Sequence, residues 1–226
     1  MNKCQLCLSR TNSSDQYFCY QCLPYLPFIT KHCKKCALPT EVDLDVCGRC
    51  QTNPFDFDRA FSLFEYRYPM VHWIGSYKAN KLTNLVQLEQ WFYSAFYHQY
   101  HEQTIDAIIA IPSSPVKTLI RGEIPSYPLA QAIHKRTHIP FIRGVLSKDW
   151  SEQSQKSKSR EARLSNHRFK LHEERLWRGS TQLDTVLLVD DVMTTGASLN
   201  EASKLLKKAG VGKVFTLTIA RTPSYP

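Results

Sequence analysis

Hydrophobic and polar positions change their pattern at about residue 55. Beyond it, the four aliphatics at 186–189 are typical of a strand buried on both faces of a parallel sheet. Apolar residues between 81 and 98 recur at helical spacing and predict a helix with one broad apolar face. Strands are predicted at 60–66, 104–111, 186–190 and 213–219, and helices at positions that include 129–134 and 198–209, with Gly210 as a C-cap. Strands separated by helices imply right-handed crossovers, so the predicted fold class is α/β with a parallel sheet flanked by helices.

The first 50 residues contain too few large aliphatic side chains to build a core of their own. They hold all eight cysteines, in four Cys-x-x-Cys pairs that are separated by 11, 10 and 10 residues. A Cys-x-x-Cys turn directs two thiolates at one metal ion, and two such turns complete a tetrahedral zinc site. The candidate zinc ligands are Cys4, Cys7, Cys19, Cys22, Cys33, Cys36, Cys47 and Cys50.

About two structural zinc ions are therefore expected, and the metal supplies the folding energy of this segment. Sequential pairing assigns the first four cysteines to one ion and the last four to the other, but the spacing also allows an interleaved pairing. Disulfides, redox chemistry and free structural thiols are the alternatives. Residues 51–54 are interpreted as a linker, so the predicted domains are a zinc-binding domain at 1–53 and a sheet domain at 54–226.

Composition and charge narrow the classes of function. The 226 residues suffice for one full domain plus a small one, and 42% hydrophobic with 22% charged residues is typical of a globular chain. No apolar run is long enough for a membrane helix and the N-terminus lacks a secretory signal, so we expect a cytosolic protein. The formal charge of +9 suits nucleic acid or a phosphorylated metabolite, although a solvated basic surface without a polymer partner accounts for it equally well.

The strand at 186–190 runs into two adjacent acids and then into a turn of small and hydroxyl residues that opens a helix. Ligands of parallel sheets lie beyond the carboxyl ends of the strands. The turn suits a phosphate, whereas adjacent carboxylates suit sugar hydroxyls or a divalent ion. The pattern indicates a sugar-phosphate site, and an ordinary Asp-rich turn is the alternative. The candidate residues are Asp190, Asp191, Met193, Thr194, Thr195, Gly196, Ala197 and Ser198.

Two polar segments are further candidates for ligand contact. The loop after Pro112 also follows a predicted strand, and its Lys117 and Arg121 either meet a pyrophosphate or are simply solvated. Residues 147–170 are hydrophilic and basic. A long polar loop inside a compact domain is often a lid or a binding loop, and a disordered insertion is the alternative.

The run at 186–198 resembles the phosphoribosyl pyrophosphate (PRPP) motif of type I phosphoribosyltransferases. Taken with other segments, it makes nearly the whole chain resemble the ComF/GntX family of competence-associated proteins. One departure is Glu123-Ile124-Pro125, where that family usually has Phe-Asn-Gln, so this loop is expected to contact pyrophosphate differently or poorly. The other matching segments are the cysteine pairs, Tyr77-Lys78, Ile111-Pro112 with Arg121-Gly122, the spacing of Gln155, Ser159, Arg160, Arg163 and Asn166, and Ala220-Arg221.

This resemblance implies a type I phosphoribosyltransferase-like fold that binds PRPP with Mg²⁺. It implies that Asp190 and Asp191 contact the ribose hydroxyls and that residues 194–198 hold the 5′-phosphate. It also implies a part in natural transformation: handling incoming single-stranded DNA in the cytoplasm, at the inner membrane, with competence or DNA-processing proteins as partners. The candidates for DNA contact are Lys148, Lys156, Lys158, Arg160, Arg163 and Arg168, together with Lys34, Lys35 and Arg49 of the zinc-binding segment.

Two other functions fit the sequence. An active phosphoribosyltransferase would act on an unidentified base or amine, but the sequence shows no base-recognition element or dedicated general base. A regulatory sensor would change a protein or DNA interaction when it binds PRPP. We assign no catalytic residue and leave enzymatic activity open.

Overall fold

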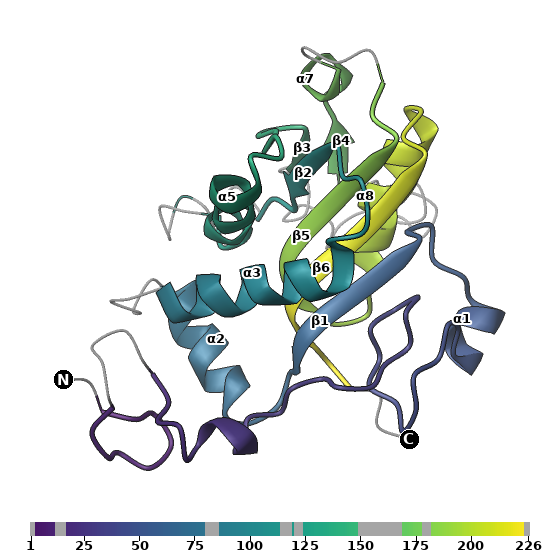
Figure 1. The fold of residues 1–226 in the computed structure, drawn as a ribbon. Coiled ribbons are helices and arrows are strands. Elements are labelled where there is room, and N and C mark those ends of the chain that lie inside the picture. The colour runs from purple at the N-terminus through teal and green to yellow at the C-terminus, as the bar shows by residue number, and fades with distance from the viewer. Residues whose placement is uncertain are drawn as a thin grey trace, which may run out of the picture.

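The centre of the molecule is a parallel four-stranded sheet with the strand order β1-β6-β5-β2 (Figure 1). The structure is a computed structural model and describes residues 3–11, 17–79, 86–113, 119, 124–148, 169–177 and 182–223. The four strands are β1 (Arg59–Glu65), β2 (Ala107–Ala110), β5 (Thr185–Met193) and β6 (Lys213–Arg221). The predicted parallel α/β fold is therefore confirmed.

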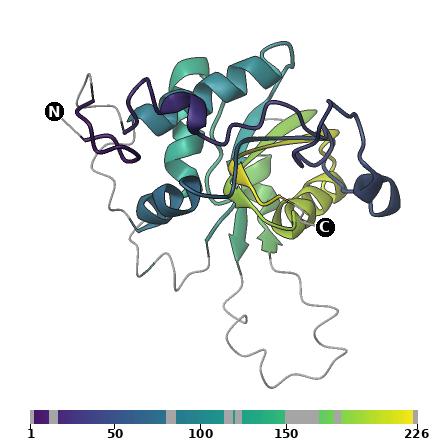
Figure 2. The same cartoon turned by 90° about the horizontal axis from the view of Figure 1, so that it is seen from below.

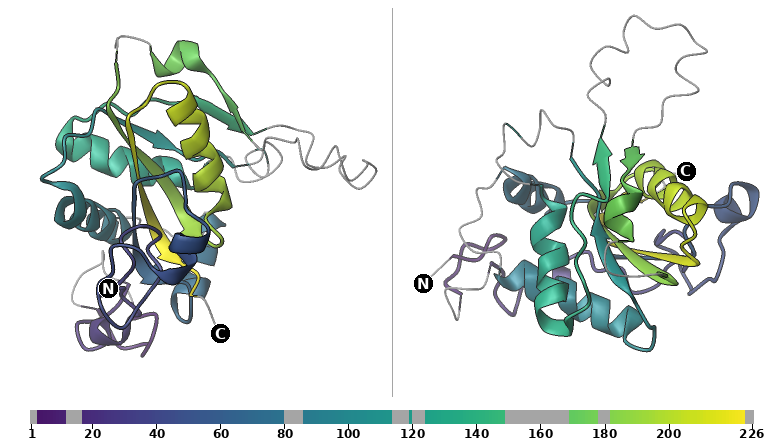
Figure 3. Two further views of the ribbon diagram at one scale, coloured as in Figure 1. Left: turned by 90° about the vertical axis from the view of Figure 1, so that its right-hand side faces the viewer. Right: turned by 90° about the horizontal axis from the view of Figure 1, so that it is seen from above.

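Helices cover both faces of this sheet (Figure 3). Three of them, α2 (Met70–Lys78), α3 (Val86–Tyr100) and α5 (Ser126–Thr137), lie on one face, and α8 (Ala197–Lys208) lies on the other. Leu187 and Val189 of β5 point into the first layer, whereas Val186 and Leu188 point into the second. Because successive strand residues face opposite sides, this arrangement explains the run of four aliphatics.

A short antiparallel hairpin stands beside the α8 layer (Figure 2). It consists of β3 (Leu146–Lys148) and β4 (Phe169–Leu171), and α7 (Glu173–Leu176) follows it. Leu146 and Phe169 are buried in the same apolar cluster as α8. The hairpin brackets the hydrophilic segment that we predicted as a lid, and residues 149–168 of that segment lie outside the described residues.

The cysteine-rich segment packs against the edge of β1. Between the two groups of cysteines, the N–H of Ile29 donates to the carbonyl of Leu63 at 3.0 Å, and the N–H of Glu65 donates to Pro27 at 2.8 Å. This pairing covers what would otherwise be an open strand edge. The 3₁₀ turn η1 (Leu23–Tyr25) precedes this stretch, and α1 (Gly48–Thr52) begins inside the last Cys-x-x-Cys pair.

Most predicted elements occur close to their expected positions. The strand predicted at 104–111 is shorter, at Ala107–Ala110, and the one predicted at 213–219 continues to Arg221. Helix α3 is described from Val86, because residues 80–85 of the predicted helix lie outside the described part of the chain. Helix α2 was not predicted: it has nine residues and no side-chain N-cap, so it carries little local signal.

The end of α8 shows how a glycine completes a helix. Gly210 lies one residue beyond the C-cap Ala209 and has a φ of +103°. The N–H of Val211 donates to Leu206 at 3.1 Å, and that of Gly210 donates to Lys207 at 3.0 Å. These two bonds form a Schellman motif, in which glycine is favoured because the backbone is left-handed.

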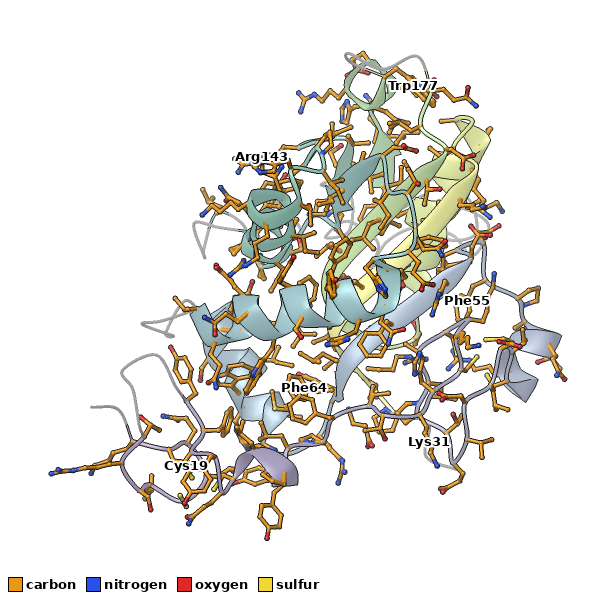
Figure 4. The ribbon with its side chains drawn as sticks, in the orientation of Figure 1. Cys19, Lys31, Phe55, Phe64, Arg143 and Trp177 are labelled. Carbon is orange, nitrogen blue, oxygen red and sulfur yellow. The ribbon has the colours of Figure 1, made fainter. Side chains whose placement is uncertain are left out.

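Phe64 of β1 joins the cysteine-rich segment to the helices, because it lies between β1 and α2 (Figure 4). Its ring is fully buried, 4.6 Å from Phe28 and 5.7 Å from Trp91. We predict that Phe64→Ala lowers the free energy of unfolding by about 3–5 kcal/mol, since a large cavity remains. Denaturant unfolding measures the loss. The matched control is Val42→Ala at an exposed position, which should change stability by no more than about 0.5 kcal/mol.

Candidate functional site

The two adjacent acids lie near the carboxyl end of β5, where Asp190 pairs in register with Thr218 of β6. A carboxylate oxygen of Asp191 lies 2.9 Å from Nζ of Lys78, and the two side chains are only 16% and 26% exposed. Lys78 is the last residue of α2, so its charge is also favoured by the helix dipole. The fold thus places one carboxylate of the pair beside a cation.

Asp190 has a strongly altered acidity. Burial and the repulsion from Asp191 raise the pKa of Asp190 to about 8, against the opposing charges of Lys78 and Lys148. The N–H of Asp191 donates to Oδ1 of Asp190 at 2.8 Å and also opposes the rise. The carboxyl group is therefore largely neutral at neutral pH. A neutral Asp190 can hydrogen-bond a sugar hydroxyl while repelling a nearby phosphate less than a carboxylate would.

The turn between β5 and α8 has a backbone that suits an anion. Gly196 is the N-cap of α8 with a φ of +83°, and a Cβ there would lie 3.0 Å from the ring of Phe55. Both facts require glycine. The N–H of Ala197 donates to Oγ1 of Thr195 at 3.3 Å. Within the described residues, the N–H groups of Thr195 and Gly196 have no acceptor, so they are available to a ligand at the helix N-terminus.

Two arginines hold the opposite side of this turn. Nη1 of the buried Arg221 donates to the carbonyl of Met193 at 3.1 Å and to that of Thr194. Arg49, from the last Cys-x-x-Cys pair, donates to the carbonyl of Thr195 at 3.2 Å. With three consecutive carbonyls engaged on the side of the cysteine-rich segment, the turn is fixed in one orientation.

The eight cysteines form two separate sets in sequential order. The Sγ atoms of each set lie within 4.8 Å of one another, which confirms sequential pairing; the sets are Cys4, Cys7, Cys19 and Cys22, and Cys33, Cys36, Cys47 and Cys50. All eight thiols are free, so the disulfide alternative is wrong. Sγ atoms of the first set lie 3.7 Å apart between Cys7 and Cys19, and those of the second lie 3.8 Å apart between Cys36 and Cys47. Four sulfurs about 2.3 Å from a central zinc ion would be about 3.8 Å apart.

The two sets repeat one local structure. The first Cys-x-x-Cys pair of each set is followed directly by a residue with a left-handed backbone, Leu8 with a φ of 62° and Ala37 with a φ of 56°. In the second set, the N–H of Cys47 donates to Sγ of Cys33 at 3.2 Å, and in the first set the N–H of Cys19 donates to Cys4 at 3.3 Å. Such N–H groups stabilise thiolates. Burial raises the pKa of Cys36 to about 11, so four thiolates need a cation in order to coexist.

Only some of the other predicted site residues lie in the described part of the chain. Lys148 lies on β3, close enough to Asp190 for its charge to lower that pKa, and its Nζ is 5.8 Å above the ring of Phe169. The charge of Lys148 therefore acts on the acids, although we had predicted this residue as a DNA contact. Lys34 and Lys35 lie within the second cysteine set, where Lys34 pairs with Asp45 at 2.7 Å. Seven further candidates lie outside the described residues, as does Glu123 of the departure: Lys117, Arg121, Lys156, Lys158, Arg160, Arg163 and Arg168.

The sequence did not single out Lys78 and Arg221 as site residues. Both lie in segments that carry the resemblance, Tyr77-Lys78 and Ala220-Arg221, and this was the only signal that pointed to them. The hydroxyl of Tyr77 donates to the carbonyl of Pro125, which ties α2 to the start of α5.

Comparison with known proteins agrees with this geometry. The phosphoribosyl transferase domain matches residues 92–226, so the chain belongs to that family. It is also similar to competence protein ComFC of Bacillus subtilis, with 26% identity over 92% of this chain and 85% of that protein. DNA utilization protein YhgH of Escherichia coli K12 is 25% identical over 84% of each chain. Adenine phosphoribosyltransferase of Marinobacter nauticus is 29% identical over 51% of this chain and 56% of that protein.

The predicted resemblance to ComF-type proteins, and with it the phosphoribosyltransferase-like fold, is confirmed by these matches. Within the described residues, none of the helices is both long enough and apolar enough to span a bilayer. The boundary at residues 53 and 54 stays a prediction.

We predict about two zinc ions in each purified chain, one for each set of four thiols. Cys36→Ser with Cys50→Ser should leave one ion, and so should Cys7→Ser with Cys22→Ser, because each pair of substitutions opens one tetrahedral site. Elemental analysis of the purified variants measures this. Loss of both ions in either variant would contradict two independent sites, and a metal-free wild type would refute the zinc assignment.

The raised pKa of Asp190 predicts how stability depends on pH. The folded state keeps a proton that the unfolded chain releases above about pH 4, so wild-type stability falls as pH rises toward the folded pKa of about 8. Asp190→Asn keeps the acceptor for the N–H of Asp191 but cannot ionise. Its stability relative to wild type should therefore rise by at least about 1 kcal/mol between about pH 5 and about pH 8. Denaturant unfolding at both pH values tests this, with exposed Glu41→Gln as the control; an equal difference between Asp190→Asn and wild type at both pH values would contradict it.

Proposed function

We propose that this chain binds PRPP at the carboxyl end of β5 and takes part in DNA uptake by handling incoming single-stranded DNA. The observation that carries the ligand assignment is the pair Asp190–Asp191 beside a glycine-capped helix N-terminus whose turn is held from behind by Arg221 and Arg49. Few ligands need hydroxyl acceptors and a phosphate cradle side by side, and a ribose phosphate needs both.

In this proposal, different residues contact the 5′-phosphate, the ribose hydroxyls and the pyrophosphate of PRPP. The turn at 194–198 takes the 5′-phosphate through N–H groups and hydroxyls, including that of Ser198. Asp190 and Asp191 accept hydrogen bonds from the ribose hydroxyls. Lys78 and Lys148 supply positive charge beside the acids, where the pyrophosphate of PRPP would otherwise be repelled. Lys117 and Arg121 are proposed to complete the pyrophosphate contact.

Mg²⁺ fits this donor set, because hard carboxylate oxygens and substrate phosphates are its usual ligands. Bound with PRPP, the ion would neutralise pyrophosphate charge. Asp191 already has Lys78 at 2.9 Å and Asp190 is largely protonated, so we propose that the ion is held chiefly by the phosphate oxygens of the ligand itself. Zinc is proposed for both cysteine sets as a structural metal.

The DNA role rests on the relatives and on charge. One relative is named for competence and another for DNA utilization, and both are matched over more than four fifths of this chain. The net charge of +9 suits a polyanion. We propose that the protein works on the cytoplasmic side of the inner membrane, together with DNA-processing proteins.

An active phosphoribosyltransferase is the second candidate, favoured by the similarity to adenine phosphoribosyltransferase over 119 residues. Such a reaction would rely on positioning the ribose and stabilising the departing pyrophosphate, which the same turn and cations supply. Release of pyrophosphate from PRPP in the presence of adenine or other nucleobases would establish it. Absence of release with every base and amine tested would favour a binding function alone.

We predict that Asp190→Ala with Asp191→Ala weakens PRPP binding by about thirtyfold or more, since a hydrogen bond to the ion-paired Asp191 contributes about 1.5–3 kcal/mol and one to the largely neutral Asp190 about 0.5–1.5 kcal/mol. Removing two acids should leave inorganic pyrophosphate binding unchanged or stronger, because only PRPP has ribose hydroxyls. Calorimetry with Mg²⁺ measures both ligands. The control is Glu173→Ala with Glu174→Ala on exposed α7, which removes two acidic side chains elsewhere.

The outcomes separate the parts of the proposal. Wild-type PRPP affinity in the Asp190→Ala, Asp191→Ala variant would refute the site. Parallel loss of PRPP and pyrophosphate would point to damage to the fold, which circular dichroism and zinc content would reveal. If the wild-type protein does not bind a single-stranded oligonucleotide at low salt, the DNA role is refuted, but the proposed PRPP site is not affected.

A further inference from the structure

A basic cleft lies at the amino end of the sheet, between the second cysteine set and the first residues of β1 and β6. Its volume is about 630 Å³, within the range of about 300–1,000 Å³ that encloses a drug-sized ligand. Thr218, the register partner of Asp190, is five residues beyond Lys213 along β6, or about 16 Å at about 3.3 Å per residue. The basic cleft is thus distinct from the PRPP site. Its polar and charged wall includes Lys34, Lys35, Asp45, Asp58, Arg59 and Lys213.

Positive charge is in excess in this cleft. Lys34 pairs with Asp45 at 2.7 Å, and Asp58 pairs with Lys207 at 2.8 Å. These pairs use both acids of the wall. Within the described residues, Lys35, Arg59 and Lys213 form no ion pair, although the charge of Arg59 also helps to lower the pKa of Asp45, so positive charge is left over for a ligand.

Arg59 adds directional donors to this charge. Its Nη2 makes one long bond, 3.4 Å, to Gln99, and its guanidinium lies 5.7 Å above the ring of Tyr100. Its Nε is buried and has no acceptor in the described part of the chain. A buried donor without a partner is rare in proteins. Because this Nε is shut off from solvent, a phosphate in the cleft would contact the other nitrogen atoms of the planar guanidinium.

Apolar surface lies beside these cations. Val46 is 42% exposed at the wall, next to Pro54 and Phe215. A free inorganic anion gains nothing from such a surface, whereas the sugar and base of a nucleotide do. The cleft therefore combines a positive track for phosphates with apolar surface that the sugar and base of a nucleotide can contact.

We propose that the basic cleft binds the backbone of about one or two nucleotides of single-stranded DNA, as its volume allows. The inference rests on the proposed role in handling DNA, and it locates the contact at the end of the sheet opposite the PRPP site. These cations have one alternative role, which is to neutralise the charge of the nearby metal centre. Cys50 of the second cysteine set also lines the cleft, and a metal ion bound by four thiolates carries negative charge that lysines can offset.

The test compares two variants of the full chain. Lys35→Gln with Lys213→Gln removes two charges from the cleft, and Lys204→Gln with Lys208→Gln removes two from the exposed face of α8. Anisotropy of a labelled oligothymidylate over a salt series gives the slope of log K against log salt. The cleft variant should lose about 1.4 from this slope, at about 0.7 per phosphate contact, and bind at least about tenfold more weakly at low salt. The α8 variant should keep the wild-type slope, and both should keep wild-type affinity for PRPP and zinc content.

Each alternative result overturns the inference in a recognisable way. A wild-type slope in the cleft variant would exclude this cleft while leaving the proposed function untouched. Zinc loss in that variant would show that the lysines serve the metal centre. Thymidine monophosphate is the competitor that tests for a free-nucleotide site. If its affinity equals that of the oligonucleotide per nucleotide, the cleft binds free nucleotides and not a DNA strand. If the wild-type protein does not bind the oligonucleotide, both this inference and the proposed DNA role are refuted.

Discussion

The buried guanidinium of Arg221 is the contact on which the site depends. Its Nε donates to the carbonyl of Cys36 at 3.0 Å, and its Nη1 donates to carbonyls of the turn after β5. Burying a cation costs on the order of several kcal/mol unless charge and hydrogen bonds compensate it. Burial lowers the pKa of Arg221, while the thiols of Cys36 and Cys50 oppose that shift. A metal centre with four thiolates has a net charge of about −2 and would supply the missing compensation.

This arrangement makes three parts of the protein depend on one another. Without metal, burial keeps Cys36 protonated, and Arg221 loses the negative charge beside it. Without Arg221, the carbonyls of Met193 and Thr194 lose a buried donor, and the turn loses its fixed orientation. The second cysteine set therefore supports the turn between β5 and α8. The first set packs elsewhere, where Phe18 lies 5.6 Å from Trp73 of α2, and α2 in turn carries Lys78.

The features that the sequence predicted are local, and those that it missed are long-range. The aliphatic run of β5, the acids that follow it and the cysteine pairs each lie within a few residues, so periodicity and spacing revealed them. Sequential pairing of the cysteines needed the structure, because spacing allowed two arrangements. Arg221 meets Cys36 across 185 positions of sequence, and no local pattern reports such a contact. Lys78 was missed because α2 itself was missed, and Lys148 had been grouped with a basic segment instead of with the acids.

Helix α1 connects the two proposed ligand sites. Arg49 donates a hydrogen bond to the turn between β5 and α8, and the adjacent Cys50 lines the basic cleft. A sensor in which PRPP changes DNA affinity would need α1 to take two positions, each favoured by one ligand. Two features oppose that. The helix has five residues and begins inside a metal-binding pair, and Cys47, its N-cap, is itself one of the four ligand thiols. A tetrahedral centre that holds the N-cap and the third residue of so short a helix restricts it to one position, so we expect the two proposed ligands to bind independently and not as parts of a sensor.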